Sequence, residues 1–431
     1  MHSKRPVPAK FRQIKVPVHG ILVGHTFDII LPGQAKPMTL EVNKVEQIVD
    51  GVVTYSGSLA GDAEAFFTFS VEGRKSLGRI LIGDVAVIVR PNGDTEGHEL
   101  IMVDRGLLPI DDDTIPSNPE NTSGTTDTFS TTGASSTGSG DVRTLFLFAN
   151  NVGNESLMTS TIISEFNNAL SRSGVASSNK LSSVGIITVA SGFIGEQDCK
   201  GKILYDMHKR ISPFTNLDQW MNDNAADIAF LIVENGPVSV DCPTTETFAA
   251  PSRIGGASTG FFPGETGIQD HSQSPFSMSS ETFALGDLTA LHEIGHSLGG
   301  RHADSSIPEE MDFLNGEFAH GFDNNNAGEW QTIMGGYRAS TANRCAFDFD
   351  NPDPVTQPCE RIPYFSNPAK SATINGHFVP ALGATTITGT PGDVNVQFKA
   401  DMETWLETSG MPIVSGYFQD PPPPTSARFL T

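Results

Sequence analysis

The segment HEIGHSLGGRH, residues 292–302, brings three histidines and one glutamate together in a short run. His292 and His296 are four residues apart, so in a helix their side chains project from the same face about one turn apart. Leucines with helical spacing accompany them, at Leu288, Leu291 and Leu298. The sequence therefore predicts a helix over about residues 283–298 that presents two imidazoles side by side.

The chemistry of this segment is typical of a zinc site. Two such imidazoles can reach one cation at roughly 2 Å. Glu293 suits the transfer of a proton from a metal-activated water. Gly299 tolerates the left-handed backbone of a sharp helix exit, which can return His302 to the cation as a third ligand. Three neutral nitrogens leave one position open for water, so we predict catalytic Zn²⁺ bound by His292, His296 and His302.

Together with QTIMGGY at residues 331–337, this segment resembles the metzincin clan of zinc endopeptidases. Within the clan, HEIGHSLGGRHAD, FAHGF, TIMGGY and RIPYFSNP are most similar to reprolysin-like and peptidyl-Asp metallopeptidases. The resemblance covers about residues 142–410. It implies three histidine ligands, Glu293 as general base, Gly299 as the turn, and Met334 beneath the metal site.

Two further residues near the Met-turn keep more than one interpretation. Tyr337 lies three residues after Met334, whereas some metzincins have a tyrosine two residues after, so an oxyanion donor and a packing residue both stay possible. Arg338 could wall the substrate pocket and hold a carboxylate, which predicts acidic or polar residues after the scissile bond. It could equally face solvent or pair with a nearby aspartate.

The chain is expected to form two domains joined by a linker. Residues 1–109 are β-rich; in AFFTFSVEG, residues 65–73, apolar and polar side chains alternate as in a half-buried strand. Residues 110–141 are rich in Ser, Thr, Gly and Asp and predict a disordered linker. Residues 142–415 are the expected catalytic domain, and residues 416–431 are a Pro-rich tail. We predict that the β-rich domain is a prodomain and that maturation cuts the linker.

The catalytic domain is expected to be α/β. Buried strands alternate with helices, as in the segment that starts at Glu155, carries apolar residues every four positions and ends at Gly174, a helix C-cap signal. This alternation favours a largely parallel sheet. The metzincin resemblance adds a twisted sheet with one antiparallel edge strand and an active-site helix. The fold class predicted for the whole chain is therefore metzincin-like α/β preceded by a small all-β domain.

Composition limits the setting and the partners. The net charge of −23 argues against nucleic acid and anionic membranes as partners. The sequence has no apolar run of about eighteen residues, so we predict no membrane span. The basic start lacks an apolar signal core, so either the signal peptide has been removed or export does not use one. We expect a secreted protein whose signal peptide has been removed. A monomer is assumed.

The even number of cysteines favours two disulfides in a secreted enzyme, with four buried thiols as the alternative. Cys345 and Cys359 would close a short Pro-rich loop, which leaves Cys199 to pair with Cys242. No cysteine precedes Cys199, so a thiolate of the β-rich domain cannot block the zinc.

Two other groups suggest metals less directly. In FDFDNPDP, Asp348, Asp350 and Asp353 could bind Ca²⁺ through hard oxygen ligands, or form a solvated acidic turn. His320 lies outside the spacing of the zinc motif and suits a structural or surface role.

The function predicted from these features is a secreted zinc endopeptidase acting on protein or peptide substrates. Two alternatives stay open: a secreted binding module with a structural or degenerate zinc site, and a zinc hydrolase of non-peptide amides.

Overall fold

The computed structural model describes about half of the chain. The described residues are 13–14, 21–31, 35–83, 85–92, 97–104, 141–150, 152–174, 180–190, 203–204, 206–207, 210–234, 256–258, 276–297, 323–324, 330–334, 360–365, 372–374 and 377–379. The predicted linker, apart from Asp141, and the Pro-rich tail lie outside these residues.

The N-terminal sheet consists of eight strands in the order β1-β8-β7-β6-β5-β4-β3-β2, each antiparallel to its neighbours. The strands are β1 (Gln13–Ile14), β2 (Thr26–Ile29), β3 (Met38–Gln47), β4 (Val53–Leu59), β5 (Asp62–Glu72), β6 (Lys75–Ile82), β7 (Val85–Pro91) and β8 (His98–Asp104). Consecutive strands from β2 to β8 are neighbours, so most of the sheet is a meander. Gly83, with φ 52°, supplies the left-handed residue in the turn between β6 and β7.

Both faces of the central strands β4 to β7 of the N-terminal sheet are buried. One face encloses its own apolar cluster, in which Phe67 and Phe69 stack with ring centroids 5.1 Å apart. The other face lies against helices. The strand predicted for AFFTFSVEG is confirmed as part of β5, but the prediction that it is only half buried is wrong, because Thr68 and Ser70 on its polar side are fully buried. Their small hydroxyl side chains allow a helix to pack closely on this face.

The second sheet has five strands in the order β10-β9-β11-β13-β12. They are β9 (Asp141–Ala149), β10 (Lys180–Val189), β11 (Ile228–Val233), β12 (Gly256–Ser258) and β13 (Phe276–Ser280). The first four strands of this order run parallel, and the short edge strand β12 runs antiparallel to β13. Smaller pairings join β14 (Asp323–Asn324), β15 (Trp330–Gln331) and β16 (Glu360–Arg361), and separately β17 (Ala372–Ile374) and β18 (His377–Val379).

The helices are α1 (Glu155–Ser173), α3 (Leu217–Asn224), α4 (Glu281–Gly286) and α5 (Thr289–Ser297). Helix α1 ends at Gly174 in the left-handed conformation, as the sequence predicted. The single helix predicted over 283–298 is instead two helices, α4 and α5. Leu288 between them has φ 42°, which an α-helix cannot accommodate, so the chain turns before the histidines begin.

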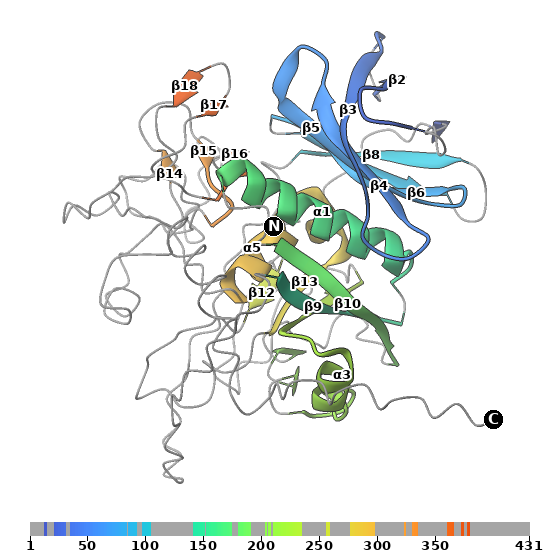
Figure 1. The fold of residues 1–431 in the computed structure, drawn as a ribbon, viewed down its shortest axis with the longest axis vertical. Coiled ribbons are helices and arrows are strands. Elements are labelled where there is room, and N and C mark those ends of the chain that lie inside the picture. The colour runs from blue at the N-terminus through green and yellow to red at the C-terminus, as the bar shows by residue number, and fades with distance from the viewer. Residues whose placement is uncertain are drawn as a thin grey trace, which may run out of the picture.

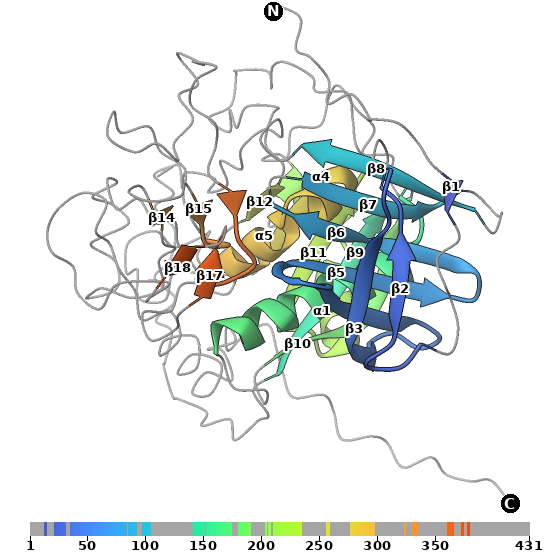
Figure 2. The ribbon, with the colours of Figure 1, turned by 90° about the horizontal axis from the view of Figure 1, so that it is seen from above.

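Two helices pack between the sheets (Figure 1, Figure 2). Helix α1 contacts β10 on one side and β4, β5 and β6 on the other, and α4 contacts strands of both sheets. Helix α5 lies against β12 and β13. One continuous hydrophobic core consequently runs from the N-terminal sheet, through the helices, into the five-stranded sheet.

The fold class predicted from the sequence is wrong. The described chain is mostly antiparallel β, its largest sheet is the N-terminal one, and its helices are few. Parallel sheets usually bury their faces under layers of helices. Here α1 and α4 carry a second sheet on their outer side. The alternation of strands and helices in the sequence could not predict this arrangement. It predicts only that a helix packs on the sheet formed by the strands next to it in sequence, and not that a second sheet covers its other side.

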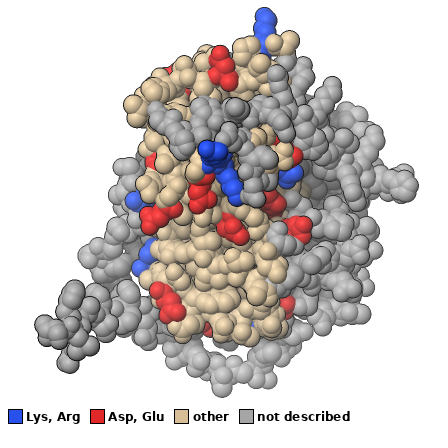
Figure 3. Space-filling view, turned by 90° about the vertical axis from the view of Figure 1, so that its right-hand side faces the viewer, with Lys and Arg blue, Asp and Glu red and all other residues tan. Residues whose placement is uncertain are grey.

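On the face that looks right in Figure 1, Asp and Glu side chains are scattered over a mainly uncharged surface, with Lys and Arg among them (Figure 3). Within the described part of the chain, no helix combines the length and the apolar character that a membrane crossing requires.

Candidate metal centre

Helix α5 positions the two histidines of the motif in the protein interior. His292 is fully buried and His296 is 2 % exposed. Their rings are nearly perpendicular, at 89°, and their Nε2 atoms are 3.0 Å apart. The four-residue spacing thus brings both imidazole tips to one point, as helix geometry predicts.

A backbone carbonyl orients the first histidine. His292 Nδ1 lies 2.6 Å from the carbonyl oxygen of Ile333. Since a carbonyl oxygen only accepts hydrogen bonds, Nδ1 carries the proton and Nε2 of the neutral ring keeps its lone pair. Metal-binding histidines are commonly held in this way, with one nitrogen donating to a carbonyl and the other facing the metal.

These two side chains fit a zinc ion. Nitrogens 3.0 Å apart can both reach one cation at roughly 2 Å, and the proton on Nδ1 of His292 leaves the correct nitrogen for binding. Within the described residues no three potential ligands of the His, Cys, Asp or Glu type gather around one point. Two of the three predicted ligands are described, whereas His302 lies outside the described residues.

Met334 lies directly against α5, between the turns that carry the two histidines. A Cβ atom built on Gly295 would be 2.3 Å from the sulfur of Met334, so the thioether occupies the space that a side chain at 295 would need. Both Met334 and Ile333 are fully buried. The segment that the sequence singled out as a Met-turn therefore contacts the histidine helix through a carbonyl and through a side chain.

Glu293 lies against the edge strand β12. A Cβ atom built on Gly256 would meet the Oε1, Cγ and Cδ atoms of Glu293 at 2.4, 2.5 and 2.7 Å. The glutamate is fully buried, and burying a carboxylate in an apolar setting is costly. Its position in the core, one residue from a histidine of the pair, supports a role at the site rather than on the surface.

Serine hydroxyls hold the C-terminal end of α5 against the sheet. Ser297 Oγ donates to Ser277 Oγ at 2.9 Å, and it lies 3.3 Å from Ser258 Oγ. Ser258 and Gly256 are two residues apart in β12, so both face the helix. A sheet surface of such small residues lets α5 approach closely.

Sequence reasoning missed four contributors to this site: Gly256, Ser258, Ser277 and Gly295. A signal existed for Gly295, because a glycine in a helix interior costs stability and often indicates close approach of another group. The others occur in short Ser- and Gly-containing strands that carry no comparable signal.

Several predicted residues lie outside the described residues, so their roles stay predictions. They are Gly299, His302, Tyr337 and Arg338 around the site, the four cysteines Cys199, Cys242, Cys345 and Cys359, the aspartates Asp348, Asp350 and Asp353, and His320.

Comparisons with known proteins do not assign a family. No family model and no curated protein matches the chain. Solved structures that match include a chaperone–substrate complex, at TM-score 0.37 and 12% identity over 82% of this chain and 44% of the other. They also include metalloproteinase-II from Bacteroides fragilis, at TM-score 0.36 and 13% identity over 64% of this chain and 81% of the other. The chain spans less than half the length of the first of these, and similarity this low carries no argument about fold or activity.

Proposed function

We propose that the protein is a zinc-dependent endopeptidase whose zinc motif is of the metzincin type. The observation that carries the proposal is the convergence of the His292 and His296 Nε2 atoms, 3.0 Å apart, on the helix that also carries the buried Glu293. A structural zinc site needs no such carboxylate. The predicted third ligand is His302.

Each residue has a defined task in this proposal. Zinc, when bound, acts as a Lewis acid toward water and toward the scissile carbonyl. His292 and His296 hold the ion, and the carbonyl of Ile333 keeps His292 in the required tautomer. Glu293 accepts a proton from the attacking water as the new C–O bond forms, and it returns that proton to the amide nitrogen before the peptide C–N bond breaks.

The edge strand β12 supports a peptide substrate over other amides. It is the last strand of the described five-stranded sheet, and Gly256 within it contacts Glu293. An extended peptide can bind a sheet edge through main-chain hydrogen bonds. Such pairing along β12 would bring a substrate backbone beside the proposed general base. Export and a monomeric state are part of the proposal and rest on the sequence alone.

The test compares metal content with peptide hydrolysis. We expect about one zinc per chain and casein cleavage that a chelator abolishes and added zinc restores. Glu293→Gln should lower kcat by roughly 10²–10⁴-fold while zinc content is unchanged. Glu72→Gln, at an exposed position at the end of β5, is the matched control and should retain full activity.

The alternatives give different results. A binding module would hold zinc but cleave neither casein nor small amides. A hydrolase of non-peptide amides would leave casein intact yet cleave a small amide in a manner that depends on Glu293. Full casein cleavage by Glu293→Gln would show that the proposed mechanism is wrong.

A further inference from the structure

A buried ion pair joins the N-terminal sheet to the helices behind it. Arg79 in β6 is fully buried, and its Nε and Nη2 donate to the two carboxylate oxygens of Glu165 in α1, at 2.7 and 2.5 Å. Its Nη1 donates to the carbonyl oxygen of Leu285 in α4 at 3.0 Å. A single guanidinium therefore binds two helices that belong to the other side of the interface.

Hydroxyl groups extend the contact along α1. Thr161 Oγ1 donates to Ser70 Oγ of β5 at 2.9 Å, and Ser70 also bonds Thr54 Oγ1 of β4 at 2.9 Å. Ser164 Oγ donates to Glu46 of β3 at 2.5 Å. Successive turns of α1 are thus bonded directly to β5 and β3, and through Ser70 to β4 between them.

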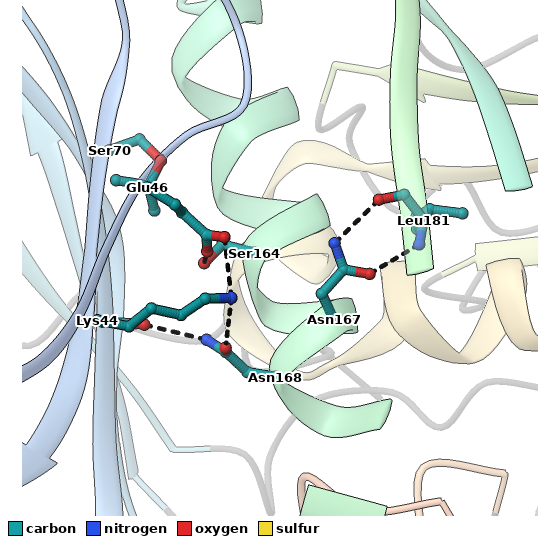
Figure 4. A network of polar contacts seen from close by, with 9 residues as sticks. Lys44, Glu46, Ser70, Ser164, Asn167, Asn168 and Leu181 are labelled. Carbon is teal, nitrogen blue, oxygen red and sulfur yellow. Dashed lines mark hydrogen bonds and ion pairs between the residues drawn. The ribbon is translucent and has the colours of Figure 1, made fainter. Parts of the chain in front are cut away.

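Two asparagines complete the arrangement (Figure 4). Asn168 accepts from Lys44 of β3 at 3.3 Å and donates to Ser56 of β4 at 3.1 Å. Asn167, the next residue, exchanges two hydrogen bonds with the backbone of Leu181 in β10, at 2.9 and 2.7 Å. Adjacent side chains of one helix therefore bind the two sheets.

The apolar part of this interface belongs to the same core. Side chains of the N-terminal sheet join the core cluster that contains the helices and the five-stranded sheet; they are Val52, Phe66, Leu77, Leu81, Ala86, Ile88 and Val103. The guanidinium of Arg172 from α1 lies 4.2 Å above the ring of Phe66. Separation of the two parts would expose this apolar surface to water and would break the ion pair between Arg79 and Glu165.

We infer that the N-terminal sheet is a permanent subunit of this protein: once the chain is cut between β8 and β9, the sheet stays bound to α1 and α4. The expected mature form is therefore a complex of two chains. This inference rests on the interface alone and not on the metal. The predicted processing would then have a different outcome: a cut within 110–141 would break the covalent connection, but the sheet would stay bound.

The experiment uses the full chain with a site-specific protease sequence placed within residues 120–135. After complete cutting, size-exclusion chromatography and native mass spectrometry should show one particle with the mass of the intact chain, about 46.0 kDa. This particle should persist in 1 M NaCl, because salt screens buried pairs weakly. Elution of a separate, folded C-terminal piece would overturn the inference.

Variants then test whether the buried pair holds the subunit. Arg79→Met should weaken association of the cut pieces on the order of 100-fold, since it leaves a buried carboxylate without its partner. Arg79→Met with Glu165→Met removes both charges and should recover most of that loss. Lys36→Met is the matched control, because Lys36 is exposed in the connection between β2 and β3 of the same sheet.

Association within about threefold of the parent is expected for that control. Should Arg79→Met fail to fold, the double variant still decides, because it lacks the uncompensated charge. A double variant that falls apart like the single one, or a single variant that associates as tightly as the parent, would contradict the role assigned to Arg79.

Discussion

Helices α1 and α5 are both buried in the middle of the molecule, but they are held by opposite means. Helix α1 uses long polar side chains, such as Glu165 and Asn167, that reach out to strands on either side. Helix α5 instead packs closely where glycines have no side chain: Gly295 leaves room for Met334, and Gly256 of β12 leaves room for Glu293. Helix α1 binds its surroundings mainly through long polar side chains, whereas α5 relies on space left by glycine, with only the short side chain of Ser297 bonded to the sheet at its end.

The difference follows from what the polar groups are for. On α5 the polar side chains of the motif are His292, Glu293 and His296, and their tips must stay directed at the proposed metal centre. Packing therefore has to come from close backbone approach, which small residues permit. On α1 no chemistry competes for the polar groups, so they are available to join two sheets. Substitutions at the two helices should consequently fail in different ways.

The largest effect on stability is expected for Arg79→Met. Breaking a buried pair by removing one partner costs about 3–5 kcal/mol. Burial raises the pKa of Glu165, while Arg79 and, more weakly, Arg172 oppose that rise. Without Arg79 the pKa of Glu165 in the folded protein rises further, so the folded protein binds more protons than the unfolded chain.

The free energy of unfolding of this variant should therefore fall as pH rises above the ordinary pKa of glutamate, about 4.3. Urea titrations at pH 5 and pH 8 should show a smaller deficit, relative to the parent, at pH 5. Adding Glu165→Gln should remove the pH dependence of the deficit. An equal deficit at both pH values with Glu165 intact would count against the ion pair.

Gly256→Ala should act on catalysis rather than on folding. The new methyl group would have to displace the Glu293 side chain, because the built Cβ is 2.4–2.7 Å from three of its atoms. We expect kcat to fall about 10–100-fold with KM and bound zinc nearly unchanged, since misplacing a catalytic group by about 1 Å can cost that much. Gly153→Ala is the control, because its Cβ would meet nothing within 4 Å. A normal kcat of Gly256→Ala would show that Gly256 is not needed to position Glu293.

The smallest effect is expected for Gly295→Ala. Overpacking against Met334 costs about 1–3 kcal/mol, while alanine returns up to about 1 kcal/mol of helix propensity. A net destabilisation of about 1 kcal/mol should appear in chemical denaturation. Combining it with Met334→Ala should cost less than the sum of the single variants, because the smaller side chain vacates the contested space. Strict additivity would mean that the two residues do not compete for space.

Local patterns predicted individual elements well where one chain segment supplies all the information. Helix α1 was predicted with its C-terminal glycine, because apolar periodicity and a left-handed cap are properties of the segment itself. The proximity of His292 to His296 was predictable for the same reason. The break at Leu288 was not, since neither propensity nor spacing distinguishes one continuous helix from two short ones that are held at an angle by tertiary packing.

The sequence by itself determined which side chains share a helix face, and hence that the imidazoles of His292 and His296 lie together on α5. It also placed the carboxylate of Glu293 on the same helix, next to His292. Only the tertiary structure decided what meets them: Gly256 against Glu293, the Ile333 carbonyl on His292, and Met334 under Gly295. It also decided that α1 carries a sheet on each side. The physical reason is that these contacts join segments dozens of residues apart. Such contacts form through strand pairing and close packing as the chain folds, and the periodicity within either segment does not predict them.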